Sequence, residues 1–403
     1  MRFYELEARK VLAKHGIPVP QSTLADTAAD AERIAAELGG PVLLKAQVIS
    51  PAAIRAGAVK TAATPAEAKT IAAALLGLDD GGRRPKGVLV EKKRPATKEY
   101  SLSVTYDGIR KTPVMIASDI AGNVEDIAET HPDRVVRRHF SALFPFSDYM
   151  AKELAEAIGL KGSDLTRVTG IISRLAQLFL GYDLTQADIY SLARIQDGKD
   201  VTFVALDCHL DMEVEGRTRQ KAILAELGIS PDDKRLPREP TPFEIEGAHI
   251  DTEDPRGVAG PIVEFDGNIG LVIGAGGGSL TLTDAVRRQG GRPANYAALG
   301  GNPSVRKAAR LTKLILSKPG VKKIAVMSNV VSNTRADLVA RGVIKGVLDL
   351  GLDPKETIAI FRVPGAWEAD AFKILTKYGV EYCDRSVSIS EAAKRAVDKI
   401  QGR

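Results

Sequence analysis

The sequence has few of the residues from which metal centres and aromatic-rich cores are built. Its two cysteines, Cys208 and Cys383, lie far apart and fit no metal-binding spacing. One disulfide is arithmetically possible, but two reduced thiols in a cytoplasmic protein are the better interpretation. Aromatic residues make up 5% of the chain and all hydrophobic residues 44%, so we expect a core packed mainly from aliphatic side chains.

Long apolar runs and one-sided charge are also missing. No segment approaches the roughly 20 apolar residues of a membrane span, and the opening sequence MRFYELEARK has no signal-peptide core. The net charge is +5, and basic residues are mixed along the chain rather than gathered on one stretch. We therefore expect a cytoplasmic protein with no membrane or nucleic-acid partner, whose mild basicity suits anionic ligands such as nucleotides or CoA.

The first part of the chain alternates between helical and strand-like patterns. Helices are predicted from Tyr4 to a stop at Gly16, over 28–38, from Thr64-Pro65 onward, over 151–158 and over 164–180. Strands are predicted over 41–48, 87–91, 100–106, 113–118, 184–190 and 201–207. Residues 230–257 then carry five prolines among many charges, which predicts an extended connection. We place the domains at 1–235 and 258–403, with a linker over 236–257.

The last part of the chain alternates strictly between short apolar runs and helical patterns. Strands are predicted over 269–273, 323–327 and 357–361 and near Val380, and helices over 279–289, 336–348, 368–377 and from Ser388 or Ser390. This order predicts a doubly wound parallel sheet, whose ligands bind at the carboxyl ends of the strands.

A glycine cluster, Gly274-Ala275-Gly276-Gly277-Gly278-Ser279, joins the first of these strands to its helix. Glycines let the backbone approach a ligand, and the helix start offers free amides to an anion. A dinucleotide-binding fingerprint fails, because its third glycine would fall at Ser279 and its acidic residue at Asn295. A plain tight turn remains the alternative for this segment taken alone.

The surroundings of the cluster resemble a known family. Residues 266–270, the glycine cluster, Gly290-Gly291 and 293–295 resemble the start of the CoA-ligase domain in succinyl-CoA synthetase β subunits. Residues 16–20 and 44–48 resemble the ATP-grasp half of the same subunits, while the cluster and the polar loop after Met327 are closer to the ATP-citrate lyase branch. The resemblance implies an α/β protein with an N-terminal ATP-grasp fold and a C-terminal flavodoxin-like CoA-ligase domain.

The resemblance also implies a function. Such a subunit binds Mg2+ with ATP or GTP and helps to phosphorylate a histidine on an α-type partner, which mainly binds CoA; the phosphoryl group passes to a small carboxylic acid, and CoA displaces it. None of the five histidines of this chain has a setting that resembles the phosphorylated one. The resemblance therefore predicts a hetero-oligomeric acid–CoA ligase whose catalytic histidine lies on the partner.

Four residues match nucleotide-binding positions of the family: Lys45, Arg55, Glu91 and Glu99. Lys45 interrupts an apolar strand and needs an anionic partner there, although an edge-strand lysine with a solvated tip is the alternative. Glu91 and Glu99 could equally be ordinary solvated glutamates. Arg55 stands in a loop, Ile49 to Ala58, where most of the flexible glycines of the family are replaced.

Two aspartates match the magnesium site. Asp207 ends a buried strand and matches a magnesium-binding aspartate. Asp188 begins the run Asp188-Ile189-Tyr190, in which Tyr190 replaces an amide ligand and Asp188 could compensate. With the altered loop, this change leaves two alternatives open besides the main hypothesis: the large subunit of a citryl-CoA synthetase or ATP-citrate lyase type of enzyme, and a non-catalytic paralogue.

The acid site is predicted in the second domain. Its expected residues are Asn268, Gly276, Gly277, Gly278, Ser279, Ser332, Asn333, Thr334 and Arg362. Thr334 could instead be only a helix cap. Arg362 could pair with a carboxylate bidentately, but Val363 stands where citrate enzymes would have a further arginine. The three polar residues at 332–334, in place of the glycines of succinate enzymes, suggest a more polar acid.

Overall fold

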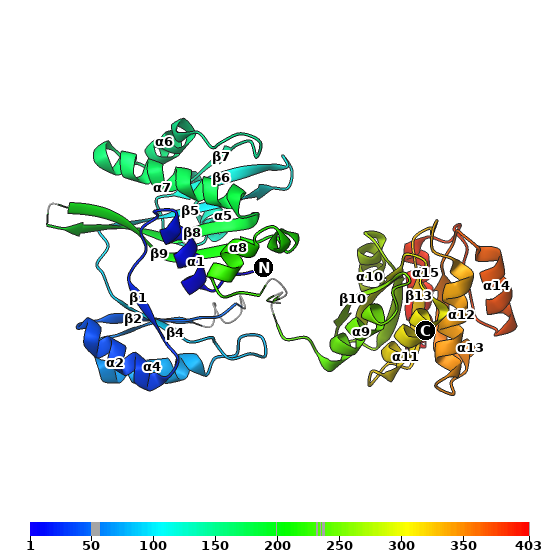
Figure 1. The fold of residues 1–403 in the computed structure, drawn as a ribbon. Helices are drawn as coiled ribbons and strands as arrows, with labels where there is room; N and C mark the ends of the chain where they lie inside the picture. The colour runs from blue at the N-terminus through cyan, green and yellow to red at the C-terminus, as the bar shows by residue number, and fades with distance from the viewer. Residues whose placement is uncertain (50–56, 199, 231–232, 234, 236–237, 403) are drawn as a thin grey trace. The chain divides into compact units, whose positions relative to one another are not determined.

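The computed structural model describes residues 1–49, 57–198, 200–230, 233, 235 and 238–402. The chain divides into two compact units, residues 1–239 and 240–403, which are drawn in Figure 1. Within the described residues, no helix is long and apolar enough to cross a membrane. Each unit has its own sheets and its own core.

The first unit begins with a four-stranded antiparallel sheet in the order β1-β4-β2-β3. Its strands are β1 (Ser22–Ala25), β2 (Val42–Ala46), β3 (Val59–Ala62) and β4 (Val88–Lys92). Helices α2 (Ala28–Leu38) and α4 (Pro65–Leu76) pack together on one face (Figure 1). Thr27 and Thr64 start these helices, because each side chain accepts a hydrogen bond from an otherwise free backbone amide.

The second sheet of this unit has five antiparallel strands in the order β7-β6-β5-β8-β9. They are β5 (Lys98–Asp107), β6 (Thr112–Ser118), β7 (Val135–His139), β8 (Leu184–Asp197) and β9 (Asp200–Met212). Helices α6 (Asp148–Ala157) and α7 (Gly162–Gly181) cover one face and share the largest core with it (Figure 1). Further helices of this unit are α5 (Val124–Thr130), η1 (Pro132–Arg134), η2 (Glu215–Thr218) and α8 (Lys221–Glu226).

Helix α1 (Glu5–Lys14) links the two sheets of the first unit. Its apolar side packs into the core of the five-stranded sheet, as Val11 and Leu12 do. Its N-terminal charged residues contact strands of both sheets, as described below. The helix ends where Gly16 turns the chain with a φ of 71°, as the sequence predicts.

The second unit is a mixed five-stranded sheet in the order β10-β12-β11-β13-β14, parallel except for β10. Its strands are β10 (Val258–Glu264), β11 (Ile269–Gly274), β12 (Asn295–Gly300), β13 (Lys323–Met327) and β14 (Ile358–Arg362). One face packs against α10 (Gly278–Arg288) and α15 (Ile389–Gln401). The other face packs against α9 (Pro242–Thr252), α11 (Val305–Ser317), α12 (Ala336–Leu348) and α14 (Glu368–Lys377), with α13 (Pro354–Thr357) before β14. This is the predicted doubly wound fold.

Three expectations about the second part of the chain are corrected. The expected linker over 236–257 contains α9, because Thr241 and Glu244 form a capping box and Pro242 occupies the first helical turn, where proline is tolerated. The pair β12 and α11 lies between β11 and β13 in sequence and was not foreseen. The strand expected near Val380 is only a single bridge between Tyr382 and Phe361.

Candidate functional site

Lys45 lies in β2, an interior strand, and its side chain is only 5% exposed. Its ammonium donates to Glu5 Oε1 at 2.8 Å and to the carbonyl of Leu206 at 2.6 Å. The edge-strand alternative is therefore wrong. Burial opposes the charged form, but Glu5 and the nearby Asp207 outweigh it and raise the pKa of the Lys45 ammonium. The lysine is thus a buried cation with anionic partners supplied by the chain itself.

Arg9 of helix α1 is the second buried cation of this cluster. Its guanidinium forms an ion pair with Glu91 of β4, and donates to Glu5 Oε1 at 2.6 Å and to the carbonyl of Leu206 at 2.7 Å. Glu91 is 1% exposed, so the solvated alternative is wrong for it. Its Oε1 has no hydrogen-bond partner in the described part of the chain and lies 4.0 Å from Lys45 Nζ.

Asp207 of β9 is the most open carboxylate beside these two cations. Its side chain is 42% exposed, and Oδ1 lies 4.0 Å from Lys45 Nζ. Partial burial raises the pKa of Asp207 to about 6, and the opposing effect of Lys45 is smaller. A carboxylate that is accessible yet beside two cations is suited to meet a ligand that carries both phosphate and a divalent cation.

Asp188 of β8 is, by contrast, already engaged by neighbouring side chains. Ser103 and Gln186 donate to its two oxygens at 2.6 and 2.7 Å, and the Tyr190 hydroxyl also bonds to it. Burial raises the pKa of Asp188 to about 6. The ring of Tyr190 stacks on His209, whose pKa burial and Arg2 lower to about 4. Asp188 is thus held inside a hydrogen-bonded group, which does not favour it as a metal ligand.

The other nucleotide candidates are less informative. Glu99 is half-buried at the start of β5 and accepts a hydrogen bond from Ser191 at 2.7 Å. Arg55 lies outside the described residues. Ile49 is the first residue of the altered loop, and its backbone amide donates to both oxygens of the buried Asp80. A carboxylate therefore anchors the start of this loop.

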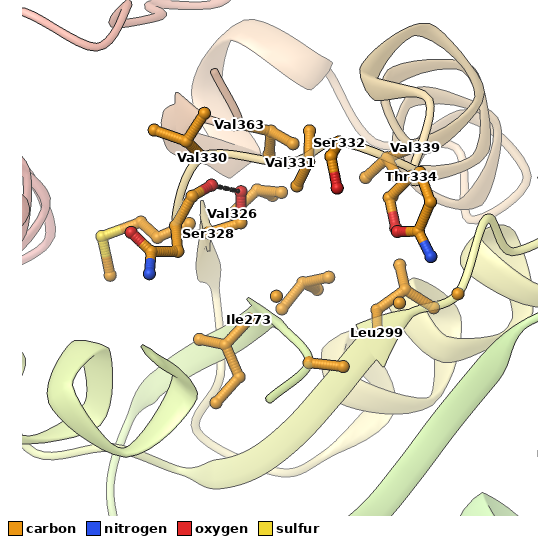
Figure 2. Close-up of a pocket in the computed structure, with 18 residues that line it drawn as sticks. Ile273, Leu299, Val326, Ser328, Val330, Val331, Ser332, Thr334, Val339 and Val363 are labelled. Atoms are coloured by element: carbon orange, nitrogen blue, oxygen red, sulfur yellow. Dashed lines mark hydrogen bonds between the residues drawn. The ribbon is translucent and has the colours of Figure 1, made fainter. Parts of the chain in front are cut away.

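A pocket of about 150 Å³ lies in the second unit, at the carboxyl ends of its parallel strands. None of the 18 described residues that line it is charged. Figure 2 shows the loop 328–334 on one side, Ile273 and Leu299 on the other, and the Ser332 hydroxyl pointing into the space between them. The volume is below the ~300 Å³ of pockets for drug-sized ligands, so the pocket suits a small molecule.

The loop after β13 brings the predicted Ser332, Asn333 and Thr334 together in this lining. Ser332 and Asn333 are exposed, while Thr334 is buried and its hydroxyl accepts from the Asn302 amide at 3.3 Å. Thr334 does not cap the next helix, because the residue at the cap of α12 is Arg335. The simple capping alternative for Thr334 is therefore wrong.

Only the beginning of the glycine cluster reaches the pocket. Gly274 and Ala275 line it, whereas Gly276, Gly277 and Gly278 do not. Gly276 supplies a φ of 92° to the turn, and Gly278 lies against Asn329 of the lining. The Ser279 hydroxyl is buried and bonds to the Gly276 carbonyl and the Tyr296 hydroxyl at 2.6 and 2.5 Å. Gly276, Gly277, Gly278 and Ser279 therefore form the turn beside the pocket and are not part of its lining.

Two predicted acid-site residues lie elsewhere. Asn268 precedes β11 and is at the amino edge of the sheet, opposite to the pocket, because the pocket lies beyond Ile273 at the other end of the strand. Arg362 is buried, and it donates to the backbone carbonyls of Val387 and Ser328 at 2.8 and 2.6 Å. It therefore fixes the loop that follows β13, and its neighbour Val363 lines the pocket in its place.

Sequence reasoning missed Glu5 and Arg9. Their spacing of four residues places both on one face of α1, but a charged pair near a helix start is ordinarily solvated. Only the tertiary structure reveals that this face is covered by β2, β4 and β9. No group of three or more metal-ligating side chains occurs among the described residues.

Comparisons with known proteins identify the family of the chain. Residues 2–194 match the ATP-grasp domain family. The chain is 33% identical to the β subunit of the GDP-forming succinate–CoA ligase of Thermus thermophilus and 32% identical to that of the ADP-forming enzyme of Chloroflexus aurantiacus, with 100% of each chain covered. ATP citrate lyase from Methanothrix soehngenii shares the fold, with a TM-score of 0.68 at 18% identity over 98% of this chain and 99% of that one. The chain belongs to the succinate–CoA ligase β-subunit family.

Proposed function

We propose that this protein is the nucleotide-binding β subunit of an ADP- or GDP-forming acid–CoA ligase, active with an α-type partner that carries the phosphorylated histidine. The observation that carries the proposal is the pair of buried cations, Lys45 and Arg9, beside the open carboxylate of Asp207. Such a group can neutralise phosphate oxygens and hold the accompanying cation. The uncharged pocket of the second unit is the proposed acid site.

The chemistry explains why both sites are needed. A thiol cannot displace an oxide from a carboxylate, because the oxide is a poor leaving group. In the proposed sequence the terminal phosphoryl group leaves the nucleotide for the partner's histidine and then bonds to a carboxylate oxygen of the acid. The CoA thiol attacks the resulting acyl phosphate and releases inorganic phosphate, with a thioester as product. In this sequence the first unit supplies charge for phosphoryl transfer, and the second unit positions the acid.

The residues fit a Mg2+ site of the kind that a nucleotide completes. Mg2+ commonly takes one or two carboxylates together with phosphate oxygens and water. Asp207 offers one open carboxylate, while Asp188 is occupied by three donors and Tyr190 is a neutral phenol. When bound, the ion would offset the charge of the transferring phosphoryl group. We therefore assign Asp207 alone as the protein ligand and withdraw Asp188.

The pocket bears on the nature of the acid. Ser332, Asn333 and Thr334 offer hydroxyl and amide groups above an aliphatic floor that includes Val326 and Leu299. Arg362 is bonded to backbone carbonyls and Val363 is apolar, so nothing in the described lining favours a tricarboxylate such as citrate. A small acid whose second polar group reaches Ser332 fits this chain best.

The test uses binding and then turnover. Millimolar MgATP or MgGTP should raise the apparent unfolding temperature of the full chain, since a ligand at 100 times its Kd adds about 2.7 kcal/mol. The α-type partner is then added, and CoA-dependent ADP or GDP release is measured over a panel of small acids. No shift with either nucleotide would contradict the proposal and would favour the second candidate, a non-catalytic paralogue, which the Tyr190 substitution and the hydrogen-bonded Asp188 support.

A further inference from the structure

Helix α1 contributes a cation that none of the expected nucleotide-site positions includes. Arg9 is 3% exposed, although an arginine of a helix surface is normally solvated. It contacts the four-stranded sheet through Glu91 and the five-stranded sheet through the Leu206 carbonyl. A buried guanidinium that bridges two sheets beside a proposed phosphate site requires an explanation beyond packing.

Arg9 and Lys45 share the carboxylates of the cluster. Glu5 Oε1 is shared, since it accepts from Arg9 at 2.6 Å and from Lys45 at 2.8 Å. Glu91 bonds to Arg9 through Oε2, while its Oε1 stands 4.0 Å from Lys45 without a hydrogen bond. Arg9 therefore holds Glu91 away from Lys45 and takes part of the charge of Glu5.

We propose that Arg9 is a positioning residue of the nucleotide site, which keeps the Lys45 ammonium available to a phosphate by drawing Glu91 and Glu5 toward itself. The cluster has three carboxylates (Glu5, Glu91 and Asp207) against two cations. Without Arg9, three carboxylates would face a single lysine, and Glu91 would be free to close on it. An incoming polyphosphate would then meet a lysine that is fully paired, in a site more negative than the one with Arg9.

Arg9 also fixes the backbone at the metal candidate. The carbonyl that it shares with Lys45 belongs to Leu206, the residue before Asp207. Two charge-assisted hydrogen bonds to one carbonyl hold the open edge of β9 at a set distance from β2. The position of the Asp207 carboxylate relative to Lys45 therefore depends on Arg9. This inference rests on the proposed function, because it concerns the same nucleotide site.

The experiment measures the Kd of MgATP for the full chain by calorimetry. Arg9→Met should weaken binding about tenfold or more, the effect of one neighbouring charge on a buried ionic site. Arg9→Lys should restore most of the affinity. In the double variant Arg9→Met/Glu5→Gln, one cation and one carboxylate are removed together, and its affinity should recover toward that of the parent. Urea unfolding of the parent and of each variant, measured in parallel, identifies any change in Kd that only follows a change in stability.

Arg235 provides the matched control. Its side chain is 6% exposed and forms an ion pair with Glu7, which like Arg9 belongs to α1. Glu7 is two residues from Glu5, however, and so points to the opposite side of the helix. Arg235→Met removes a comparable buried cation and should leave the Kd within about twofold of the parent. Equal losses in Arg9→Met and Arg235→Met, or no recovery in the double variant, would overturn the inference alone. Should the parent chain bind neither MgATP nor MgGTP, the proposed function fails and the inference fails with it.

Discussion

The two candidate sites of this chain use opposite chemistry. In the first unit, Lys45 and Arg9 are buried with carboxylates that neutralise them. In the second unit, the pocket at the carboxyl ends of the strands has no charged residue in its described lining. A site for a polyphosphate must store cations, and cations inside a protein are stable only when paired. A site for a small acid can rely on hydroxyl groups, amides and shape, and burying such neutral groups costs much less free energy than burying a charge.

The largest effect is expected from removing the central cation. Lys45→Met leaves Glu5 and Glu91 to share the single cation of Arg9, and breaking a buried pair costs about 3–5 kcal/mol. We expect a loss of this size in the unfolding free energy of the first unit, measured by urea denaturation, together with loss of the thermal shift by nucleotide. Acid binding to the second unit should persist.

Lys307 offers a control in the other unit. It is fully buried in α11 and donates to Asp251 and to the Gly257 carbonyl, both at 2.8 Å. Lys307→Met should destabilise the second unit by a similar amount and leave nucleotide binding intact. If Lys307→Met also removed nucleotide binding, loss of a buried lysine would act through general instability, and the contrast between the sites would fail.

Acid binding in the pocket should be sensitive to a steric change rather than to a change of charge. A Cβ on Gly274 would lie 2.4 Å from the Ser328 Cβ and 3.0 Å from its Cα. Gly274→Ala must therefore push β11 away from the loop after β13, at a cost of about 1–3 kcal/mol. We expect weaker acid binding, measured by ligand-observed NMR, and an unchanged thermal shift with MgATP.

Gly277 is the stability control for this substitution. A Cβ there meets no atom within 4 Å, and its φ is −58°, which any residue adopts. Gly277→Ala should leave the stability unchanged or raise it by up to about 1 kcal/mol. A stability loss in Gly277→Ala as large as in Gly274→Ala would show that the clash with Ser328 is not the cause.

The sequence predicted the fold more completely than the sites. The bounds of α2 and the capped start of α4 match the prediction, because their signals are local: the glycine pair after Leu38 in the first case, and the Thr64 cap with Pro65 in the second. The sequence pattern does not predict α9, because prolines usually break a helix, whereas Pro242 stands in the first turn, where proline is tolerated. The pair β12 and α11 is also absent from the prediction. The predicted strand–helix pairs cover 269–289 and 323–348, and no element is predicted between them.

The site residues depended on contacts that no local pattern contains. Lys45 was recognised because a lysine inside an apolar strand conflicts with burial. Arg9 was not, because nothing in α1 shows that strands from two sheets cover it. Asn268 is predicted in the acid site by resemblance, but strand direction puts it at the opposite edge of the sheet. Arg362 is predicted there because it follows a strand and can pair with a carboxylate, but backbone carbonyls occupy its guanidinium.

A smaller effect should appear in the pH dependence of the first unit. Burial and Arg2 lower the pKa of His209 to about 4 in the folded chain, against 6.5 when unfolded. The unfolded state therefore takes up the proton first as the pH falls. The stabilising contribution of the neutral His209 is complete above pH 6.5 and is lost progressively between pH 6.5 and 4.

His209→Gln removes this titration. The difference in unfolding free energy between the variant and the parent is measured by urea unfolding at pH 7.5 and at pH 5. This difference should shift in favour of the variant by up to about 2 kcal/mol at pH 5. The comparison of the two pH values cancels the loss of the stacking contact with Tyr190. The uncharged second-unit pocket predicts no such dependence for Ser332 variants. A pH-independent difference between His209→Gln and the parent would contradict the lowered pKa.

The smallest effect on stability is expected where the pocket meets solvent. The Ser332 hydroxyl points into the pocket (Figure 2) and forms no hydrogen bond within the described part of the chain. Ser332→Ala should therefore change the unfolding free energy by less than about 0.5 kcal/mol. A hydrogen bond to an acid is worth about 0.5–1.5 kcal/mol, so the affinity for a recognised acid should fall about fivefold. Thr334→Val serves as the comparison, because its hydroxyl also accepts from the Asn302 amide and its loss should lower stability as well. Equal acid affinity in Ser332→Ala and the parent would mean that the acid binds through the backbone of the loop. The two sites would then differ in another way: the first would use charged side chains, and the second would use main-chain dipoles.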